Sequence, residues 1–279
     1  MTDTGAGTAT PAKTSARAGN PMASVRPTTV PEVEILSGGG INEVVKIGDS
    51  VRRPAGPWSA NVHALLRHLR AAGFTNAPEV RSTADGYEFL SYLPGDVSNY
   101  PLTPAAESVT ALTSAAKLLR AYHDATVPFA RTAPRDGWQV PARDPVEVIC
   151  HGDYAPHNCA LDGTTVTGVF DFDFAHPGPR LWDIAYAAYR WVPLTTVESD
   201  LPATVQAERL RTFCDTYGLD AESRSRLIDT VAARLHALVD VMQTRAAAGD
   251  KAFASHLADG HHTIYLTDAD YVLAVHRKS

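Results

Sequence analysis

Two polar segments in the middle of the chain lie at either end of a predicted β-hairpin. The segment HGDYAPHN, residues 151–158, follows an apolar run, and FDFDF follows at residues 170–174. Between them, strand-like runs meet at Asp162–Gly163, a dipeptide typical of hairpin turns. Because a hairpin brings its two ends together, we expect side chains of both segments to share one site. The fold must therefore place this polar hairpin against other elements.

The residues before the hairpin predict a small β-rich lobe. Residues 33–54 alternate between strand-like runs and turns, with a glycine-rich segment followed by a tight turn at Gly48–Asp49. A helical period follows at 59–74, and two short strands flank Asp85–Gly86. We assign residues 31–93 to this first lobe, which we expect to bind a nucleotide.

The residues after this lobe predict a larger helical lobe that carries the polar hairpin. The segment PGDV at 94–97 interrupts the strand pattern, and we assign residues 94–279 to the second lobe. The resulting fold class is α+β, with two lobes. Helical apolar periods are predicted at 104–124, 205–217, 222–246 and 251–258.

Composition excludes several classes of protein. Residues 1–30 consist mainly of Thr, Ala, Gly, Pro and Ser, which predicts a disordered tail. The net charge is −6 and no basic stripe occurs, so we expect no nucleic-acid partner. No stretch reaches the roughly 20 apolar residues that span a bilayer, so we expect no membrane partner. The three cysteines lack CxxC spacing and fit reduced thiols, which favours a cytoplasmic location.

The spacing of polar residues in HGDYAPHN indicates phosphoryl-transfer chemistry. The segment has the H-x-D-x-x-x-x-N spacing of a kinase catalytic loop. Such a reaction needs a carboxylate facing the acceptor hydroxyl, and oxygen ligands for a metal ion near the phosphates. Asp153 can provide the first group, and Asn158 a metal ligand. Asp171 can reach the same site as a second ligand, because it follows across the hairpin.

These motifs, together with GVFDFDFA and LWDIAYA, resemble the aminoglycoside phosphotransferase and choline kinase-like family, which is related to the protein kinases. The resemblance extends over roughly residues 33–275. It implies a protein-kinase-like fold and an enzyme that phosphorylates a hydroxyl of a small molecule, using ATP or another nucleoside triphosphate with Mg²⁺. It also implies roles for single residues: Asp153 as catalytic base or orienter, Asn158 and Asp171 as Mg²⁺ ligands, and His151 and Asp183 as structural support.

The same resemblance implies where the nucleotide binds. The segment FLSYLPG, residues 89–95, corresponds to the family's hinge between lobes, whose backbone meets adenine. The segment SGGGIN corresponds to the glycine-rich turn over the phosphates, where small residues allow close approach of the backbone. The nucleotide-binding residues implied by these segments are Gly38, Gly39, Ser91, Tyr92 and Leu93.

One family feature is missing from this chain. Family members usually have a lysine on the third strand, paired with a glutamate in the following helix. Here the strand reads SVRRP and the helix offers His63, so Arg52 or Arg53 could replace the lysine, with Lys46 on the preceding strand as a weaker candidate. Arginine binds phosphate well but is not equivalent to lysine. The segments GGGIN and VRRPAGPW also resemble those of trifolitoxin-immunity-like phosphotransferases.

Two alternative functions follow from these observations. A non-catalytic relative could confer immunity by sequestering a toxin or antibiotic; the missing lysine–glutamate pair favours this, and the intact Asp153, Asn158 and Asp171 set opposes it. A metal-dependent phosphoester hydrolase would use His151, Asp153, His157 and Asp171 as ligands, but leaves the β-rich lobe unexplained. The acceptor of a kinase could be an antibiotic or a metabolite. The mixed charge of the expected acceptor-lining segments does not indicate a polycation.

Overall fold

The structure, a computed structural model, describes residue 1 and residues 33–36 and 44–277 of the chain. The chain divides into two units, residues 1–31 and 32–279, and every element described below lies in the second unit. The predicted disordered tail at 1–30 and the predicted phosphate-binding turn with Gly38 and Gly39 lie outside the described residues.

A five-stranded antiparallel sheet forms the first part of the second unit. Its strand order is β1-β2-β3-β5-β4. The turns at Gly48 and at Asp85–Gly86 have positive φ angles, which a tight hairpin turn between such strands requires. The strands are β1 (Val33–Leu36), β2 (Val44–Ile47), β3 (Ser50–Pro54), β4 (Val80–Ala84) and β5 (Tyr87–Ser91).

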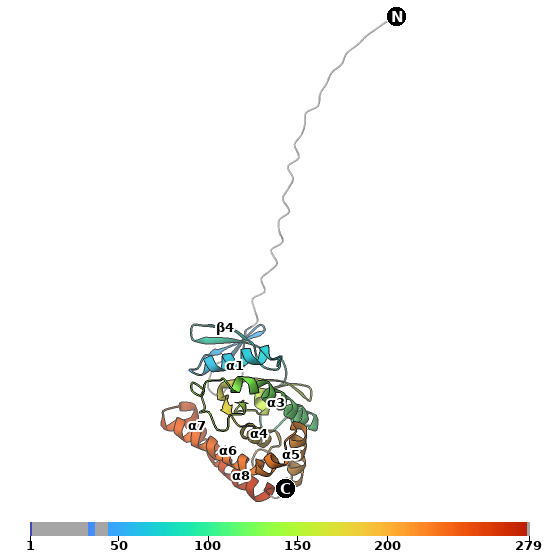
Figure 1. The fold of residues 1–279 in the computed structure, drawn as a ribbon, viewed down its shortest axis with the longest axis vertical. Helices are drawn as coiled ribbons and strands as arrows, with labels where there is room; N and C mark the ends of the chain where they lie inside the picture. The colour runs from blue at the N-terminus through green and yellow to red at the C-terminus, as the bar shows by residue number, and fades with distance from the viewer. Residues whose placement is uncertain (2–32, 37–43, 278–279) are drawn as a thin grey trace. The chain divides into compact units, whose positions relative to one another are not determined.

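Helix α1 (Ser59–Ala71) supports this sheet, and both lie at one end of the unit in Figure 1. Its apolar residues Val62, Leu65, Leu66 and Leu69 recur at helical spacing and are all buried, which is the amphipathic pattern predicted from the sequence. The chain leaves the helix through Gly73 in a left-handed conformation (φ +83°), a common way for a helix to end.

The second part of the unit is mainly helical. Helix α3 runs through its core, where Leu112, Leu119 and Tyr122 have no exposed surface. The single helix predicted at 104–124 is two helices, because Ser108 ends the first and caps the second by accepting a hydrogen bond from the Ala111 amide at 3.1 Å. The helices are α2 (Pro104–Glu107), α3 (Val109–Ala130), α4 (Arg180–Trp191), α5 (Ala203–Tyr217), α6 (Ala221–Ala247), α7 (Lys251–Ala258) and α8 (His261–His276).

Two small two-stranded sheets carry the polar segments. Strand β7 (Cys159–Asp162) pairs with β8 (Thr165–Val169) through a turn in which Gly163 has φ +57°, as the sequence predicted. Strand β6 (Val148–Cys150) pairs with β9 (His176–Gly178) and so brings the two ends of the region together. The α+β fold with a β-rich part and a larger helical part is confirmed. Within the described ranges, no helix is both long and apolar enough to span a membrane.

Candidate active site

The β7–β8 hairpin brings Asn158 and Asp171 together, as its length predicted. Cys159 pairs with Val169 in the hairpin, and the Phe170 amide donates to the Asn158 carbonyl at 3.0 Å. Asn158 and Asp171 consequently line one cleft. Asn158 Nδ2 donates to Asp153 Oδ2 at 2.8 Å and to the Asp153 carbonyl at 2.9 Å. All three residues singled out from the sequence thus belong to one polar cluster.

The backbone of the segment 151–158 is held by Asp183 on α4. One carboxylate oxygen of Asp183 accepts from the His151 amide at 2.7 Å, and the other accepts from the Gly152 amide at 2.9 Å. The His123 ring, from α3, lies 3.0 Å from the same carboxylate. Burial alone raises the pKa of a carboxyl group, but the hydrogen bond and charge of His123, with the His151 amide, lower the pKa of Asp183 to about 2.

Gly152 is required by the close approach of another segment. Its φ angle is +81°, and a Cβ built on it would lie 2.2 Å from the Phe174 carbonyl oxygen. The Gly152 carbonyl accepts a 2.7 Å hydrogen bond from the buried Arg234 guanidinium of α6. The segment that bears Asp153 is therefore held on both sides of its backbone.

His151 is buried and has hydrogen-bonding partners on both ring nitrogens. Nε2 lies 3.0 Å from the Phe170 carbonyl, and Nδ1 accepts from the Asp153 amide at 3.2 Å. Its ring packs 4.7 Å from the Phe172 ring, and burial lowers its pKa. A neutral ring with both nitrogens engaged is suited to fixing the loop rather than to proton transfer.

The Asp153 carboxylate faces a cluster of donors. Burial alone would raise its pKa, but the hydrogen bond and charge of His157, together with the Tyr186 hydroxyl, hold the pKa of Asp153 well below its usual range. His157 Nε2 lies 3.6 Å from Asp153 Oδ2. Asp153 therefore carries a negative charge across the physiological pH range.

Of the two arginines on β3, Arg53 is the one that lines the cleft. Its guanidinium donates to Asp171 Oδ1 at 3.0 Å and also pairs with Asp173. Burial alone would lower the pKa of Arg53, but Asp173, Asp171 and Glu88 raise it, so the side chain stays charged. Arg52 places its guanidinium 4.9 Å from the centre of the Tyr87 ring. Adjacent strand residues point to opposite faces, which explains the difference between the two arginines.

The glutamate that the helix lacks is provided by the sheet. Glu88 on β5 is the direct cross-strand neighbour of Arg53, and its Oε1 lies 2.5 Å from Arg53 Nε. Its other oxygen lies 2.5 Å from Nε2 of His63, the α1 residue that stands where a glutamate was expected. Glu88 has no exposed surface. The chain therefore has a buried Arg–Glu ion pair in which both partners belong to adjacent strands.

Asp171 is held in a conformation that aspartate adopts more readily than most residues. Its backbone is left-handed, with φ 63° and ψ 67°. Aspartate and asparagine tolerate this region because their short polar side chains bond locally, although it still carries strain. The Asp171 side chain is 44% exposed, so it is accessible to a ligand in the cleft.

The cleft between the sheet and the hairpin has a volume of about 350 Å³. Its walls are largely apolar, and the polar residues gather at one side: Arg53, His157, Asn158 and Asp171. This combination is typical of small-molecule sites. The apolar wall includes Leu36, Val44, Val51, Leu90, Phe170 and Phe172.

The predicted hinge residues Ser91, Tyr92 and Leu93 also line this cleft. The Ser91 amide donates to the Glu79 carbonyl at 2.9 Å, and the Tyr92 amide donates to the Asp49 carbonyl at 2.8 Å. Both amides are therefore already engaged in hydrogen bonds within the protein.

The ligand set expected of a phosphoester hydrolase does not assemble. Within the described residues, no group of three or more His, Cys, Asp or Glu side chains could hold a metal ion. Both nitrogens of His151 are already engaged, as described above. Metal ligands of another kind are present: Asn158 has an amide oxygen and Asp171 a carboxylate, and Mg²⁺ prefers such oxygen ligands. With Asn158 Nδ2 directed at Asp153, its Oδ1 is the atom left to face the cleft.

Several residues of the site were not identified from the sequence. Glu88 stands alone as an acid in the apolar run YEFLSYL, and that isolation was the available signal. His123 lies on the face of α3 that the apolar period marks as buried. The others, Tyr186 and Arg234, join the site through contacts between distant segments.

Comparisons of the sequence with known proteins agree on one family. The model of the phosphotransferase enzyme family matches residues 32–144 and 137–228. The trifolitoxin immunity protein of Rhizobium leguminosarum bv. trifolii is 32% identical over 207 residues, which cover 70% of this chain and 77% of that protein.

Solved structures with similar folds include kinases of small molecules. A choline/ethanolamine kinase family protein from Mesorhizobium loti has a TM-score of 0.57 and 18% identity, covering 91% of this chain and 95% of the other. An amicoumacin kinase in complex with AMP-PNP, Ca²⁺ and amicoumacin has a TM-score of 0.60 and 13% identity, covering 82% of this chain and 88% of the other. At these identities the likeness concerns the fold.

Proposed function

Because this chain belongs to the phosphotransferase enzyme family, we propose that it transfers a phosphoryl group from ATP, or another nucleoside triphosphate, to a hydroxyl of a small molecule. The observation that carries the proposal is that Arg53, Asn158 and Asp171 line one largely apolar cleft and that Asn158 hydrogen-bonds Asp153. This arrangement can hold a flat apolar base at one end and charged phosphates at the other.

In this proposal the base lies between the apolar residues of the sheet and of the hairpin, including Val51 and Phe170. The backbone of Leu93 meets its polar edge, because the amides of Ser91 and Tyr92 already donate to protein carbonyls. Arg53 replaces the family's lysine and binds a phosphate oxygen, and Glu88 sets the direction of its guanidinium.

Asn158 and Asp171 would hold Mg²⁺. When bound, this ion supplies positive charge close to the phosphate oxygens. Asp153 accepts a hydrogen bond from the acceptor hydroxyl and so points the hydroxyl oxygen at the phosphate. Because the pKa of Asp153 is low, its main contribution is to orient the hydroxyl rather than to act as a strong base.

A second candidate function is immunity by sequestration of a toxin or antibiotic without catalysis. The relative named trifolitoxin immunity protein favours it. The buried Arg53–Glu88 pair removes the main argument for it, because the absent lysine–glutamate pair has a structural counterpart. We therefore place phosphoryl transfer first and an antibiotic among its plausible acceptors.

Binding of nucleotide and metal tests the proposal directly. We expect ATP with Mg²⁺ to raise the melting temperature of the wild-type protein, and ATP with EDTA to raise it much less. Asp171→Ala should lose the part of the shift that depends on Mg²⁺. Asp153→Asn should keep that shift but release ADP at least about 100-fold more slowly with any acceptor found, since positioning of the nucleophile is lost.

The outcomes separate the two functions. Metal-dependent nucleotide binding with acceptor-dependent ADP release supports the kinase. If no nucleotide shifts the melting temperature of the wild-type protein in the presence of Mg²⁺, the kinase proposal fails. Stabilisation by a toxin or antibiotic alone would then support sequestration.

A further inference from the structure

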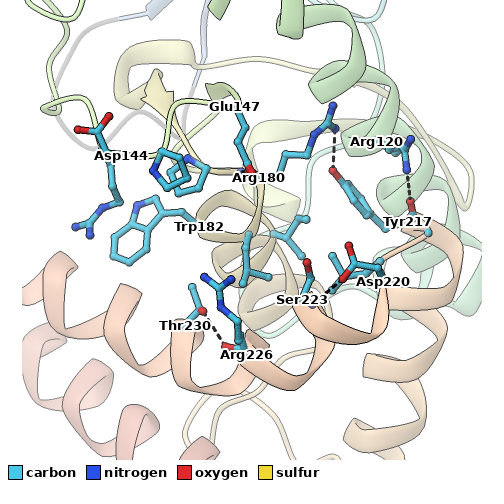
Figure 2. A pocket seen from close by; sticks show the side chains of 17 residues that line it. Arg120, Asp144, Glu147, Arg180, Trp182, Tyr217, Asp220, Ser223, Arg226 and Thr230 are labelled. Atoms are coloured by element: carbon cyan, nitrogen blue, oxygen red, sulfur yellow. Dashed lines mark hydrogen bonds between the residues drawn. The ribbon is translucent and has the colours of Figure 1, made fainter.

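A second cavity, of about 440 Å³, lies among helices of the second part of the unit and shares no lining residue with the nucleotide cleft. It is formed where α4 and α6 begin and where α5 ends, with α3 and the segment 143–147 completing its wall (Figure 2). Its volume falls within the range of small-molecule sites. The proposed phosphotransferase reaction makes no use of it.

The carboxylates that line this cavity already have donors. Asp144 forms a bidentate contact with Arg135, at 3.1 and 3.0 Å. Glu147 accepts from the Arg180 amide at 2.8 Å at the start of α4, and Asp220 caps α6 by accepting from the Ser223 amide at 2.7 Å. The acceptor groups of the wall are therefore largely satisfied within the protein.

The arginine side chains of the same wall have fewer carboxylate partners. Four arginines line the cavity: Arg120, Arg143, Arg180 and Arg226. Asp124 is shared by two of them, at 2.7 Å from Arg120 and 2.8 Å from Arg180. Arg226, which extends from α6 in Figure 2, comes no closer than 3.9 Å to Glu222, and both side chains are largely exposed. An ion pair of that kind contributes little.

Arg143 is the strongest indication of a ligand. Its guanidinium lies 3.6 Å from the centre of the Trp182 ring, and Arg234 approaches the same ring at 5.5 Å. Among the described residues, no carboxylate forms an ion pair with either guanidinium. Partial burial and the positive charge of Arg234 lower the pKa of Arg143. Two cations beside one aromatic ring repel each other, and an anion in the cavity would relieve that repulsion.

We propose that this cavity binds a small molecule carrying a phosphate or carboxylate group, which accepts hydrogen bonds from Arg143 and Arg226. Guanidinium groups bind both kinds of oxyanion well. The site is distinct from the nucleotide cleft, so both can be occupied at the same time.

A chain of hydrogen bonds connects this cavity to the catalytic segment. Arg180 donates to the Tyr217 hydroxyl at 3.2 Å, and that hydroxyl lies 2.8 Å from Nδ1 of His123. The opposite nitrogen of His123 lies 3.0 Å from Asp183, which holds the His151 and Gly152 amides. The proposed ligand therefore lies next to the network that positions Asp153.

Calorimetric titration with inorganic phosphate and, separately, with citrate tests the site at constant ionic strength. We expect the wild-type protein to show saturable binding of at least one probe. The double variant Arg143→Gln/Arg226→Gln should bind that probe at least about tenfold more weakly, equivalent to about 1.4 kcal/mol. The matched control is Arg67→Gln/Arg211→Gln, which removes the same two charges from exposed positions of α1 and α5 outside the cavity. Saturation by phosphate alone would assign a phosphate ester, and by citrate alone a carboxylate.

Two results would overturn the proposal. One is the absence of saturable binding of either probe up to about 10 mM, beyond the response to sodium chloride at equal ionic strength. The other is binding that the double variant retains and that Arg53→Gln abolishes, because the anion would then lie in the nucleotide cleft. Circular dichroism of the double variant shows whether the helices are intact; both replaced side chains are largely exposed.

Discussion

At the scale of single residues, Glu88 determines how Arg53 is presented to the cleft. Its carboxylate is buried between the Arg53 guanidinium and the His63 ring, with 2.5 Å to each. Because Glu88 engages Arg53 Nε, the two terminal nitrogens of the guanidinium are directed at Asp171 and Asp173. An arginine fixed in this way can replace a lysine only as long as the glutamate keeps its charge.

We therefore expect Glu88→Gln to weaken both stability and nucleotide binding. A neutral amide keeps the shape but cannot balance the charge of Arg53, so unfolding in urea should require about 1–3 kcal/mol less free energy. The affinity for ATP with Mg²⁺, measured by calorimetry, should fall about tenfold, because Arg53 loses its fixed direction.

Glu79→Gln is the matched control for this substitution. Glu79 pairs with Arg70 at 2.8 Å on the exposed surface, where such pairs contribute little. If both variants bind nucleotide equally well, Glu88 does not position Arg53.

The residues that the sequence could identify differ in kind from those it could not. Asp153, Asn158 and Asp171 are brought together by one hairpin, so their spacing predicts their proximity. Glu88 and His123 reach the site through pairings of segments far apart in the chain, which no local pattern encodes. The choice between Arg52 and Arg53 depended on which face of β3 meets the hairpin, and that face is known only once both parts are placed.

At the scale of elements, α4 acts as the support of the catalytic segment. The helix begins at Arg180 and places Asp183 in its first turn, where the carboxylate meets the His151 and Gly152 amides. All residues from Leu181 to Trp191 are buried. No helix was predicted here, because the stretch was interpreted only as the motif LWDIAYA, although its apolar residues do recur at helical spacing. Helix α8 was also not predicted; it carries apolar residues around most of its circumference.

We expect the carboxylate of Asp183 to make the free energy of unfolding decrease as the pH is lowered. Its pKa is lowered from 3.8 to about 2 in the folded protein, so its contribution is complete above about pH 4 and is lost as the pH falls towards 2. The shift corresponds to roughly 2 kcal/mol. Urea unfolding of Asp183→Asn should show lower stability at pH 7 and a shallower loss of stability between pH 4 and 2.

The exposed Asp240 of α6 provides the control for this measurement. Asp240→Asn should follow the wild-type dependence on pH. Equal slopes for wild-type protein and Asp183→Asn in acid would show that Asp183 is not the group responsible.

At the scale of the whole described unit, several contacts join the β-rich and helical parts, among them Asn61 donating to the Asp136 carbonyl at 3.0 Å. At the polar side of the cleft, Arg53 joins β3 to Asp171 and Asp173. Elsewhere Asn76 donates to the Thr167 carbonyl at 2.6 Å and accepts from the Val169 amide at 2.8 Å, and His68 lies 2.8 Å from the Ala125 carbonyl. The boundary that we place between residues 93 and 94 is a proposal consistent with these elements.

We expect Arg53→Gln to loosen the contact of β3 with Asp171 and Asp173 and to leave the Asn76 contact intact. Amide hydrogen exchange should become faster in β3 and in residues 171–174, because the ionic contacts between them are lost. Exchange in β8 should be unchanged, since the Asn76 hydrogen bonds remain. Arg67→Gln, which removes the same charge from an exposed position of α1, should accelerate neither region. Equal acceleration throughout would indicate global destabilisation instead.

The contact between Arg53 and Asp171 also affects how a metal ion and a nucleotide would bind in the cleft. The arginine serves as an internal counter-ion for Asp171, but it is shared with Asp173 and Glu88, so carboxylates outnumber cations in this cluster. If Asp171 held a metal ion, the ion would add positive charge to this carboxylate, and Arg53 would be free to turn towards a bound phosphate. Metal and nucleotide should therefore assist each other in binding, because the guanidinium displaced by the first becomes available to the second.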